Sequence, residues 1–258
     1  MKKTLLLFVA LGAASFCAKA QTNIQEMYDF NREHLTTTLE MFKGDNWGST
    51  FFFVDIYHPN KISGPTGYYT EIARALNFWK DTKLGGLSAH VEWNGGQFAS
   101  NAWLFGAEYF LHSQDFRYTL TMEVMYKTIS GQKALDDMGE ARPYDKVSNV
   151  PLQFTIVWGC NDLFGAKGLT FSGFADLWWE NNNWGLKDNG DLDNTSIVFI
   201  SEPQIWYNIG ELFNCPNLNI GGEVELAYNF AGGWRSDLDF YKNKGFNVAP
   251  ALGIKWNF

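Results

Sequence analysis

The fold class is decided by residues 245–258, which read GFNVAPALGIKWNF. Apolar residues from Phe246 to Phe258 take every second position, and small or polar residues from Gly245 to Asn257 take the positions between them. Successive side chains of a β-strand point to opposite faces, so this strand has one apolar and one polar face. A strand of a water-soluble sheet can show the same alternation, but an apolar outer face and a polar inner face are typical of a transmembrane β-barrel.

The first 20 residues have the features of a secretory signal peptide. Lys2 and Lys3 carry positive charge, an apolar segment follows, and residues 18–20 form a small-x-small cleavage site. We therefore expect a signal peptide over residues 1–20 and a single outer-membrane β-barrel over residues 21–258.

A barrel is the one membrane architecture that the rest of the sequence allows. Past the signal segment, no stretch reaches the roughly 18 to 20 uninterrupted apolar residues that a membrane helix needs. Only helices and closed barrels satisfy all their backbone hydrogen bonds in lipid. The terminal Phe258 also resembles the sorting signal of bacterial outer-membrane barrels. We expect a location in the bacterial outer membrane, with outer-membrane lipids and, through Phe258, the barrel-assembly machinery as partners.

The charge of the chain argues against a nucleic-acid partner. The sequence has 20 Lys and Arg residues against 28 Asp and Glu residues. Loss of Lys2, Lys3 and Lys19 with the signal peptide leaves 17 against 28, a formal charge of −11. An acidic surface repels the phosphates on which nucleic-acid binding depends. The aromatic content of 17 % suits strands that face lipid on one side.

Few residues suggest a disulfide, a metal site or a catalytic site. Cys160 and Cys215 remain after processing, and an exported compartment permits a disulfide between them without requiring one. No close His/Cys cluster and no loop with calcium-ligand spacing is present, so we expect no metal and no cofactor. The four histidines have no convincing nucleophile partner: His112 and Ser113 are adjacent, so they point to opposite faces of a strand. We expect the protein not to be an enzyme.

Twelve runs of alternating residues predict an all-β fold, a transmembrane antiparallel up-and-down β-barrel of about 12 strands. From the second strand on, short and long connections alternate, and the shorter set belongs on the periplasmic side. With both termini periplasmic, the strand number is even. The runs lie at about residues 24–31, 34–43, 47–57, 68–79, 84–94, 101–112, 116–128, 150–160, 168–180, 194–209, 217–229 and 245–258.

The apolar face of each run predicts which side chains point into the lumen. The inward faces are acidic, with Lys127 and Lys255 as the clear cations and His90 as a titratable neighbour. Arg74 breaks the pattern on the lipid-facing side, where a mid-bilayer arginine costs roughly 2 to 4 kcal/mol; a bulge or a height near the headgroups would remove that cost. The predicted substrate-binding residues are Glu40, Phe51, Phe53, Asp55, Glu71, Glu108, Glu123, Asp176, Trp178, Glu202, Trp206 and Glu223.

These inward residues predict a selective pore. A twelve-stranded barrel is narrower than the 16- to 18-stranded porins that hold an open channel. Aromatic rings such as Phe51 and Phe53 can stack on a planar base, and nearby carboxylates can accept hydrogen bonds from hydroxyl and amino groups. An acidic wall admits neutral or cationic solutes and repels phosphates.

Three other functions stay open: an occluded structural or adhesion barrel, a channel for another small neutral or cationic solute, and, least favoured, an outer-membrane lipase. Occlusion would follow if the inward side chains simply satisfied one another.

Several short motifs resemble the nucleoside-specific channel-forming (Tsx-like) outer-membrane porins. They are residues 39–42 (LEMF), 45–47 (DNW), 51–55 (FFFVD) and 71–72 (EI) in the early strands. Residues 231–234 (AGGW), 246–248 (FNV) and the closing WNF also resemble the last loop and strand of that family. The similarity extends over essentially the whole mature chain, with motifs of moderate specificity.

The resemblance implies a monomeric twelve-stranded barrel that passes nucleosides and deoxynucleosides through aromatic and ionisable wall residues. Carried onto this sequence, it assigns binding roles to Glu40, Phe53, Asp55 and Glu71, to which the lumen pattern adds Phe51 and Glu202. The family commonly continues the Glu-Ile strand with Pro-Arg, whereas this chain has Arg74-Ala75. An inward arginine is therefore absent from its expected place.

Overall fold

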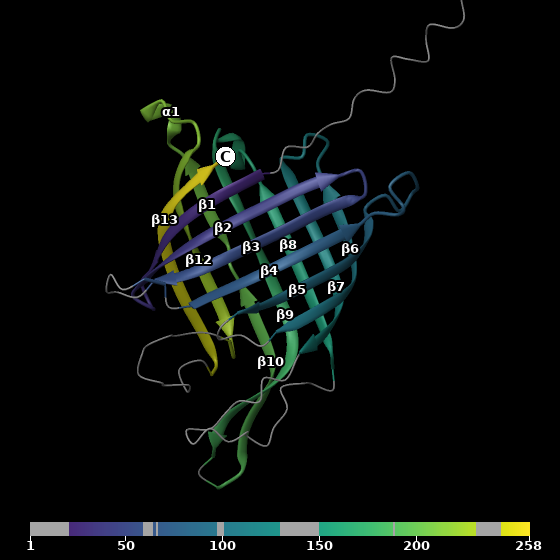
Figure 1. Cartoon of the computed structure of the whole chain (residues 1–258), viewed down its shortest axis with the longest axis vertical. Coiled ribbons are helices and arrows are strands. Elements are labelled where there is room, and N and C mark those ends of the chain that lie inside the picture. Colours follow the sequence, from purple (N-terminus) through teal and green to yellow (C-terminus); the bar gives the residue numbers. More distant parts are fainter. Residues whose placement is uncertain are drawn as a thin grey trace, which may run out of the picture.

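The protein is a closed antiparallel β-barrel in a computed structural model (Figure 1). The structure describes residues 21–58, 64–65, 67–96, 101–129, 150–187, 189–230 and 244–258. Consecutive strands pair with one another, and β1 closes the barrel by pairing with β13. The fold class predicted from the sequence is thus confirmed, while the expected signal peptide and the 130–149 connection lie outside the described residues.

Thirteen strand segments make a twelve-stranded wall, because β10 and β11 together occupy one strand position. The strands are β1 (Gln21–Asp29), β2 (His34–Asp45), β3 (Gly48–His58), β4 (Gly67–Leu76), β5 (Leu87–Gly96), β6 (Ala102–His112), β7 (Tyr118–Ile129), β8 (Leu152–Cys160), β9 (Leu169–Leu186), β10 (Leu192–Ser201), β11 (Gln204–Asn208), β12 (Leu218–Tyr228) and β13 (Phe246–Asn257). A 3₁₀ turn, η1 (Leu163–Gly165), and a short helix, α1 (Gly210–Phe213), lie in the connections. No helix among the described residues is long and apolar enough to cross a membrane.

The run predicted at 194–209 is interrupted, because Pro203 has no N–H to donate to the sheet. It forms β10 and β11, which follow each other between β9 and β12. Around the break, the Glu202 N–H donates to Phe174 O and the Val224 N–H donates to Pro203 O, both at 3.1 Å. The two segments therefore form one strand of the wall with an irregularity at Glu202 and Pro203.

Two predicted connections differ from the structure. Residues 181–193 were expected to be a long loop, but β9 and β10 continue their pairing as far as Leu186 and Leu192. This extended hairpin projects beyond one end of the barrel, opposite the end that carries α1 and the C-terminus (Figure 1). At that second end, the expected short turn at 80–83 is a longer connection from Asn77 to Gly86, closed by a hydrogen bond from Asn77 Nδ2 to Gly85 O at 2.6 Å.

Short polar side chains shape the tight turns. Asp29 Oδ1 accepts hydrogen bonds from the backbone N–H groups of Asn31 and Arg32, both at 2.8 Å, and so folds the turn between β1 and β2. Between β6 and β7, the Ser113 hydroxyl donates to Asp115 at 2.7 Å. That hydroxyl and the backbone N–H of Arg117 hold the pKa of Asp115 below its usual value.

The strand faces alternate as the sequence predicts. Outward side chains such as Ile72, Ile220 and Leu252 are exposed, at 51, 50 and 61 %. Inward side chains such as Leu104 and Met125 are fully buried. The apolar outer face differs from the polar exterior of a soluble protein, and it suits a lipid environment.

Arg74 does face outward, but it lies near the end of β4 and is paired. Its Nη1 donates to Asp45 Oδ2 at 2.7 Å and to Thr50 Oγ1 at 2.9 Å, and its Nη2 donates to Asp45 Oδ1 at 2.9 Å. A fork-shaped guanidinium on a carboxylate near the barrel rim avoids the cost of an isolated mid-bilayer charge.

Candidate functional site in the barrel lumen

The predicted binding residues all lie on the inward face, and several are neighbours across strands. Register pairs Phe53 with Glu40 on one side and Glu71 on the other. It also pairs Glu108 with Glu123 and Trp206 with Gly221. Asp176 and Trp178 follow each other on the inner face of β9, and Phe51 and Asp55 flank Phe53 on that of β3. Glu202 lies within electrostatic range of Glu223 and Asp55. Their binding role stays a prediction.

Hydroxyl and amide groups hold many of these carboxylates against the wall. Thr38 Oγ1 donates to Asp55 and Thr155 Oγ1 donates to Asp176, each at 2.6 Å. Asn23 Nδ2 donates to Glu40 at 2.8 Å, the Tyr69 hydroxyl to Glu71 at 2.6 Å, and Gln204 Nε2 to Glu223 at 2.9 Å. These donors are neutral, so they orient the carboxylates and leave their negative charge uncompensated.

The described part of the wall carries many more acidic than basic side chains. The inward bases are Arg32, Lys127 and Lys255, with His34 and His90 as titratable groups. The inward acids are Asp29, Glu40, Asp55, Glu71, Glu92, Glu108, Glu123, Asp176, Glu180, Glu202, Glu223 and Glu225. Such a lumen attracts cations and repels anions.

One group of aromatic rings lines the lumen between carboxylates. The ring centroids of Phe51 and Phe53 lie 6.0 Å apart, and those of Phe53 and Tyr69 lie 5.9 Å apart. Phe51 and Phe53 are only partly buried, so part of each ring faces the lumen. Because Glu40 and Glu71 flank Phe53 in register, apolar faces and hydrogen-bond acceptors alternate across three strands.

The two inward tryptophans are covered by lysines. Lys127 Nζ lies 4.1 Å from the Trp178 ring centroid, and Lys255 Nζ lies 4.3 Å from that of Trp206. Trp178 is 4 % exposed and Trp206 2 %. These distances are those of cation–π contacts. In this structure, the two rings pack the wall and offer no open face for stacking.

Arg32 is a lumen residue that the sequence pattern did not reveal. It leaves the turn after β1 and reaches inward, where its Nη1 donates to Asp29 Oδ2 and its Nη2 to both carboxylate oxygens of Glu225, all at 2.7 Å. The side chain is 14 % exposed. Between the two carboxylates, β13 places only Ala249 and Ala251 on the inner face, which leaves room for the guanidinium.

A polar group also lies on the outer face, near the rim that carries the β1–β2 turn. Thr37 Oγ1 donates to Glu26 Oε2 at 2.6 Å and lies 2.9 Å from His58 Nε2. No histidine was expected to have a convincing nucleophile partner; His58 does lie beside a hydroxyl, but Thr37 donates that hydroxyl to Glu26. Thr37 is 21 residues away from His58 in sequence and becomes its neighbour only through strand pairing.

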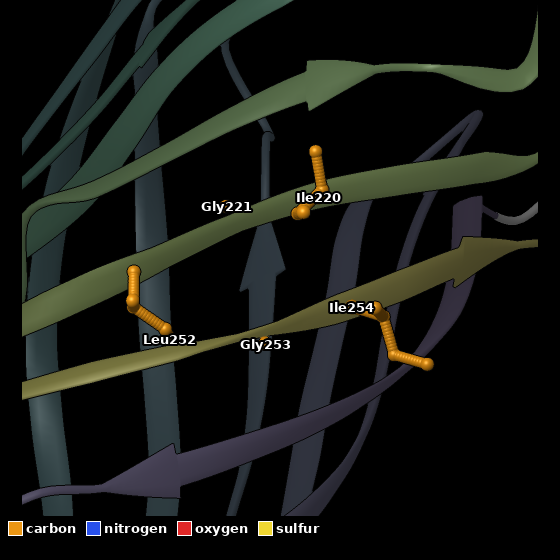
Figure 2. Close-up of a pocket in the computed structure, with 5 residues that line it drawn as sticks. All are labelled: Ile220, Gly221, Leu252, Gly253 and Ile254. Carbon is orange, nitrogen blue, oxygen red and sulfur yellow. The ribbon is translucent and has the colours of Figure 1, made fainter. Parts of the chain in front are cut away.

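Cys160 and Cys215 are both free, so the disulfide left open above is absent. Figure 2 shows a depression on the outer face of β12 and β13. It is apolar and outward, and it lies away from the carboxylates, so it belongs to the apolar outer surface of the barrel; its lining residues are Ile220, Gly221, Leu252, Gly253 and Ile254.

Comparison with solved structures finds β-barrels. The NanC porin structure is similar with a TM-score of 0.57 at 10 % identity, over 92 % of this chain and 100 % of that one. A BenF-like porin from Pseudomonas fluorescens Pf-5 gives 0.40 at 12 % identity, over 90 % and 59 % of the two chains. Outer membrane phospholipase A from Escherichia coli gives 0.40 at 11 %, over 93 % and 92 %. The NanC likeness supports the barrel fold.

Comparison of sequences gives the family. No curated protein matches the chain. Residues 21–258 match a family model described as "Domain of unknown function (DUF5020)". Because this match covers every residue that the structure describes, the chain belongs to the DUF5020 family.

Proposed function

We propose that the protein is a monomeric outer-membrane channel for the passive diffusion of small neutral or cationic solutes. The observation that carries the proposal is the contrast between the two faces of the barrel wall: exposed apolar side chains outside, and an excess of carboxylates inside. The apolar exterior suits lipid, and the acidic interior suits a water-filled path with an electrostatic preference. Export through residues 1–20 and assembly through Phe258 belong to the same proposal.

Nucleosides are the solutes that we propose for this channel. The partly open rings of Phe51 and Phe53 can stack on a base, a contact worth about 1–3 kcal/mol per base. Glu40 and Glu71, which flank Phe53, can accept hydrogen bonds from ribose hydroxyls and base amino groups. A nucleoside lacks the phosphate that an acidic lumen would repel. The covered rings of Trp178 and Trp206 are not part of this proposed binding surface.

Single-channel recording of the purified mature protein in planar bilayers tests the proposal. We expect a cation-preferring current that adenosine or thymidine blocks in a concentration-dependent way. Phe53→Ala should weaken the block, because it removes the ring between the two carboxylates. The matched control is Phe105→Ala, which removes an outward ring that is 48 % exposed. A conducting protein whose current no nucleoside affects would refute nucleosides as cargo, and a barrel without conductance would favour the occluded structural barrel.

An outer-membrane esterase is the second candidate, because Glu26, Thr37 and His58 form a polar group on the lipid-facing side. A histidine beside a hydroxyl is one requirement for nucleophilic catalysis. However, the Thr37 hydroxyl donates to Glu26 instead of to His58, so the imidazole is not placed as its general base. Ester hydrolysis by the purified protein that disappears in Thr37→Ala and His58→Ala would establish this alternative.

A further inference from the structure

A cluster of four ionisable side chains lies on the inner face of three neighbouring strands. His90 and Glu92 belong to β5, Glu108 to β6 and Glu123 to β7. The register places Glu108 beside Glu123 and opposite Ser88, one inward position from His90. Strand pairing thus gathers residues that are far apart in the sequence.

The distances within this cluster are those of groups that can share one ion. His90 Nδ1 lies 2.8 Å from Glu108 Oε2 and 4.0 Å from Glu123 Oε2. One ligand atom from each of His90, Glu108 and Glu123 lies within 4.8 Å of the others. Ligands bound at about 2.0–2.2 Å to one metal ion are separated by at most about twice that length, so small side-chain rotations suffice to close the site.

The imidazole of His90 is buried, and one of its two ring nitrogens lacks a hydrogen bond within the described part of the chain. Its side chain is 4 % exposed, and its Nε2 makes no hydrogen bond to any described residue. The nearest carboxylate oxygen, Glu92 Oε2, lies 3.4 Å away. A metal-bound histidine usually donates the N–H of its other ring nitrogen to a carboxylate, which fixes the tautomer. Here Nδ1 faces two carboxylates, and Nε2 faces a third.

The negative charge of the cluster also favours binding of a cation. Three carboxylates, with side chains 8 to 11 % exposed, surround a single imidazole. Lys127, an inward lysine of β7, donates to Gln153 at 2.8 Å and lies over Trp178, and within the cluster its charge acts on Glu92. Buried charges need partners, and even a protonated imidazole compensates only one of the three carboxylates.

We propose that the lumen wall binds one divalent transition-metal ion through Nδ1 of His90 and the carboxylates of Glu108 and Glu123, with Glu92 accepting a hydrogen bond from Nε2. Imidazole as a ligand favours the zinc class over calcium and magnesium, which prefer oxygen ligands alone. Metal ligands must be deprotonated, so the affinity should fall at acid pH. This inference goes beyond the proposed channel and does not depend on its cargo.

Calorimetric titration of the untagged mature protein in detergent with ZnCl₂ tests the proposal. We expect saturable binding of one Zn²⁺ per chain. His90→Ala and, separately, Glu123→Gln should each weaken binding at least tenfold, because loss of a hydrogen-bond partner of a ligand already costs about 10- to 100-fold in affinity. Glu180→Gln is the matched control, because Glu180 is an equally buried inward acid outside the cluster that accepts a hydrogen bond from Trp178, which glutamine can also accept.

Two further measurements check that the variants fold and identify the atoms that bind the metal. Heat-modified mobility in gels shows whether each variant still forms a barrel, and the milder Glu123→Gln replaces His90→Ala if the latter does not fold. X-ray absorption at the zinc edge should show nitrogen and oxygen ligands including one imidazole. The proposal is overturned by absence of saturable binding to the folded wild-type protein, or by binding that the cluster variants and Glu180→Gln weaken equally.

Discussion

Arg32 holds two strands of the lumen together, and its removal should destabilise the barrel. Arg32→Ala removes the guanidinium that joins Asp29 of β1 to Glu225 of β12 at 2.7 Å. The three side chains are 14, 7 and 10 % exposed, so the two carboxylates would remain buried without a counter-charge.

The expected magnitude follows from that burial. Removing one partner of a buried pair costs about 3–5 kcal/mol, and we expect about 3 kcal/mol because the three side chains keep some exposure. Equilibrium unfolding in urea, followed by tryptophan fluorescence in detergent micelles, measures the change. Glu225→Gln in the Arg32→Ala background should recover part of the loss, because it removes one uncompensated charge.

The chain offers a matched control for this prediction. Arg117 pairs with Asp115 at 2.7 Å as well, but both side chains are about half exposed, at 51 and 50 %. Pairs in such positions contribute little to stability, so Arg117→Ala should unfold at nearly the wild-type urea concentration. If Arg32→Ala and Arg117→Ala shift the midpoint equally, the reasoning about a buried lumen arginine is refuted.

Three further predictions concern a glycine of the wall, the two cysteines and the polar group on the outer face. A Cβ at position 221 would lie 2.1 Å from Ile205 O and 2.8 Å from Trp206 Cε3, so Gly221→Ala should lower the free energy of unfolding by about 1–3 kcal/mol in the same urea assay, while Ile220→Val on the outer face should change it less. Thiol titration of the unfolded, unreduced mature protein should find two thiols, from Cys160 and Cys215; finding none would contradict the free cysteines of the structure. Lipid esters should not be hydrolysed by the wild type, and hydrolysis that is lost in Thr37→Ala would contradict the channel assignment.

The strand pattern could be predicted because side-chain alternation shows which face of each strand is apolar and points out of the barrel. Residues 246–257, for example, form one regular strand, as their apolar alternation indicates. The break at Pro203 was missed because alternation continues on both sides of it. The extended β9–β10 hairpin was missed because its tip is polar and rich in Asn and Asp, which is also typical of loops.

The arrangement within the lumen could be predicted only in part. Inward facing follows from period-two alternation, and it places Lys127 and Lys255 in the lumen, but not over Trp178 and Trp206. Those contacts depend on the shear between strands, which no single strand encodes. The meeting of His90 with Glu108, 18 residues away, depends on register in the same way. Arg32 was missed because it belongs to a turn, where alternation gives no information about direction.

The reversal potential in a salt gradient shows most directly whether the acidic lumen conducts ions and which sign of charge it prefers. With the purified mature protein in a planar bilayer and a tenfold KCl gradient, we predict an open-channel current whose reversal potential has the sign of cation selectivity. Carboxylates outnumber bases on the described lumen wall, so potassium should be favoured over chloride. A current selective for chloride, or a folded and inserted barrel that passes no ions, would contradict the account.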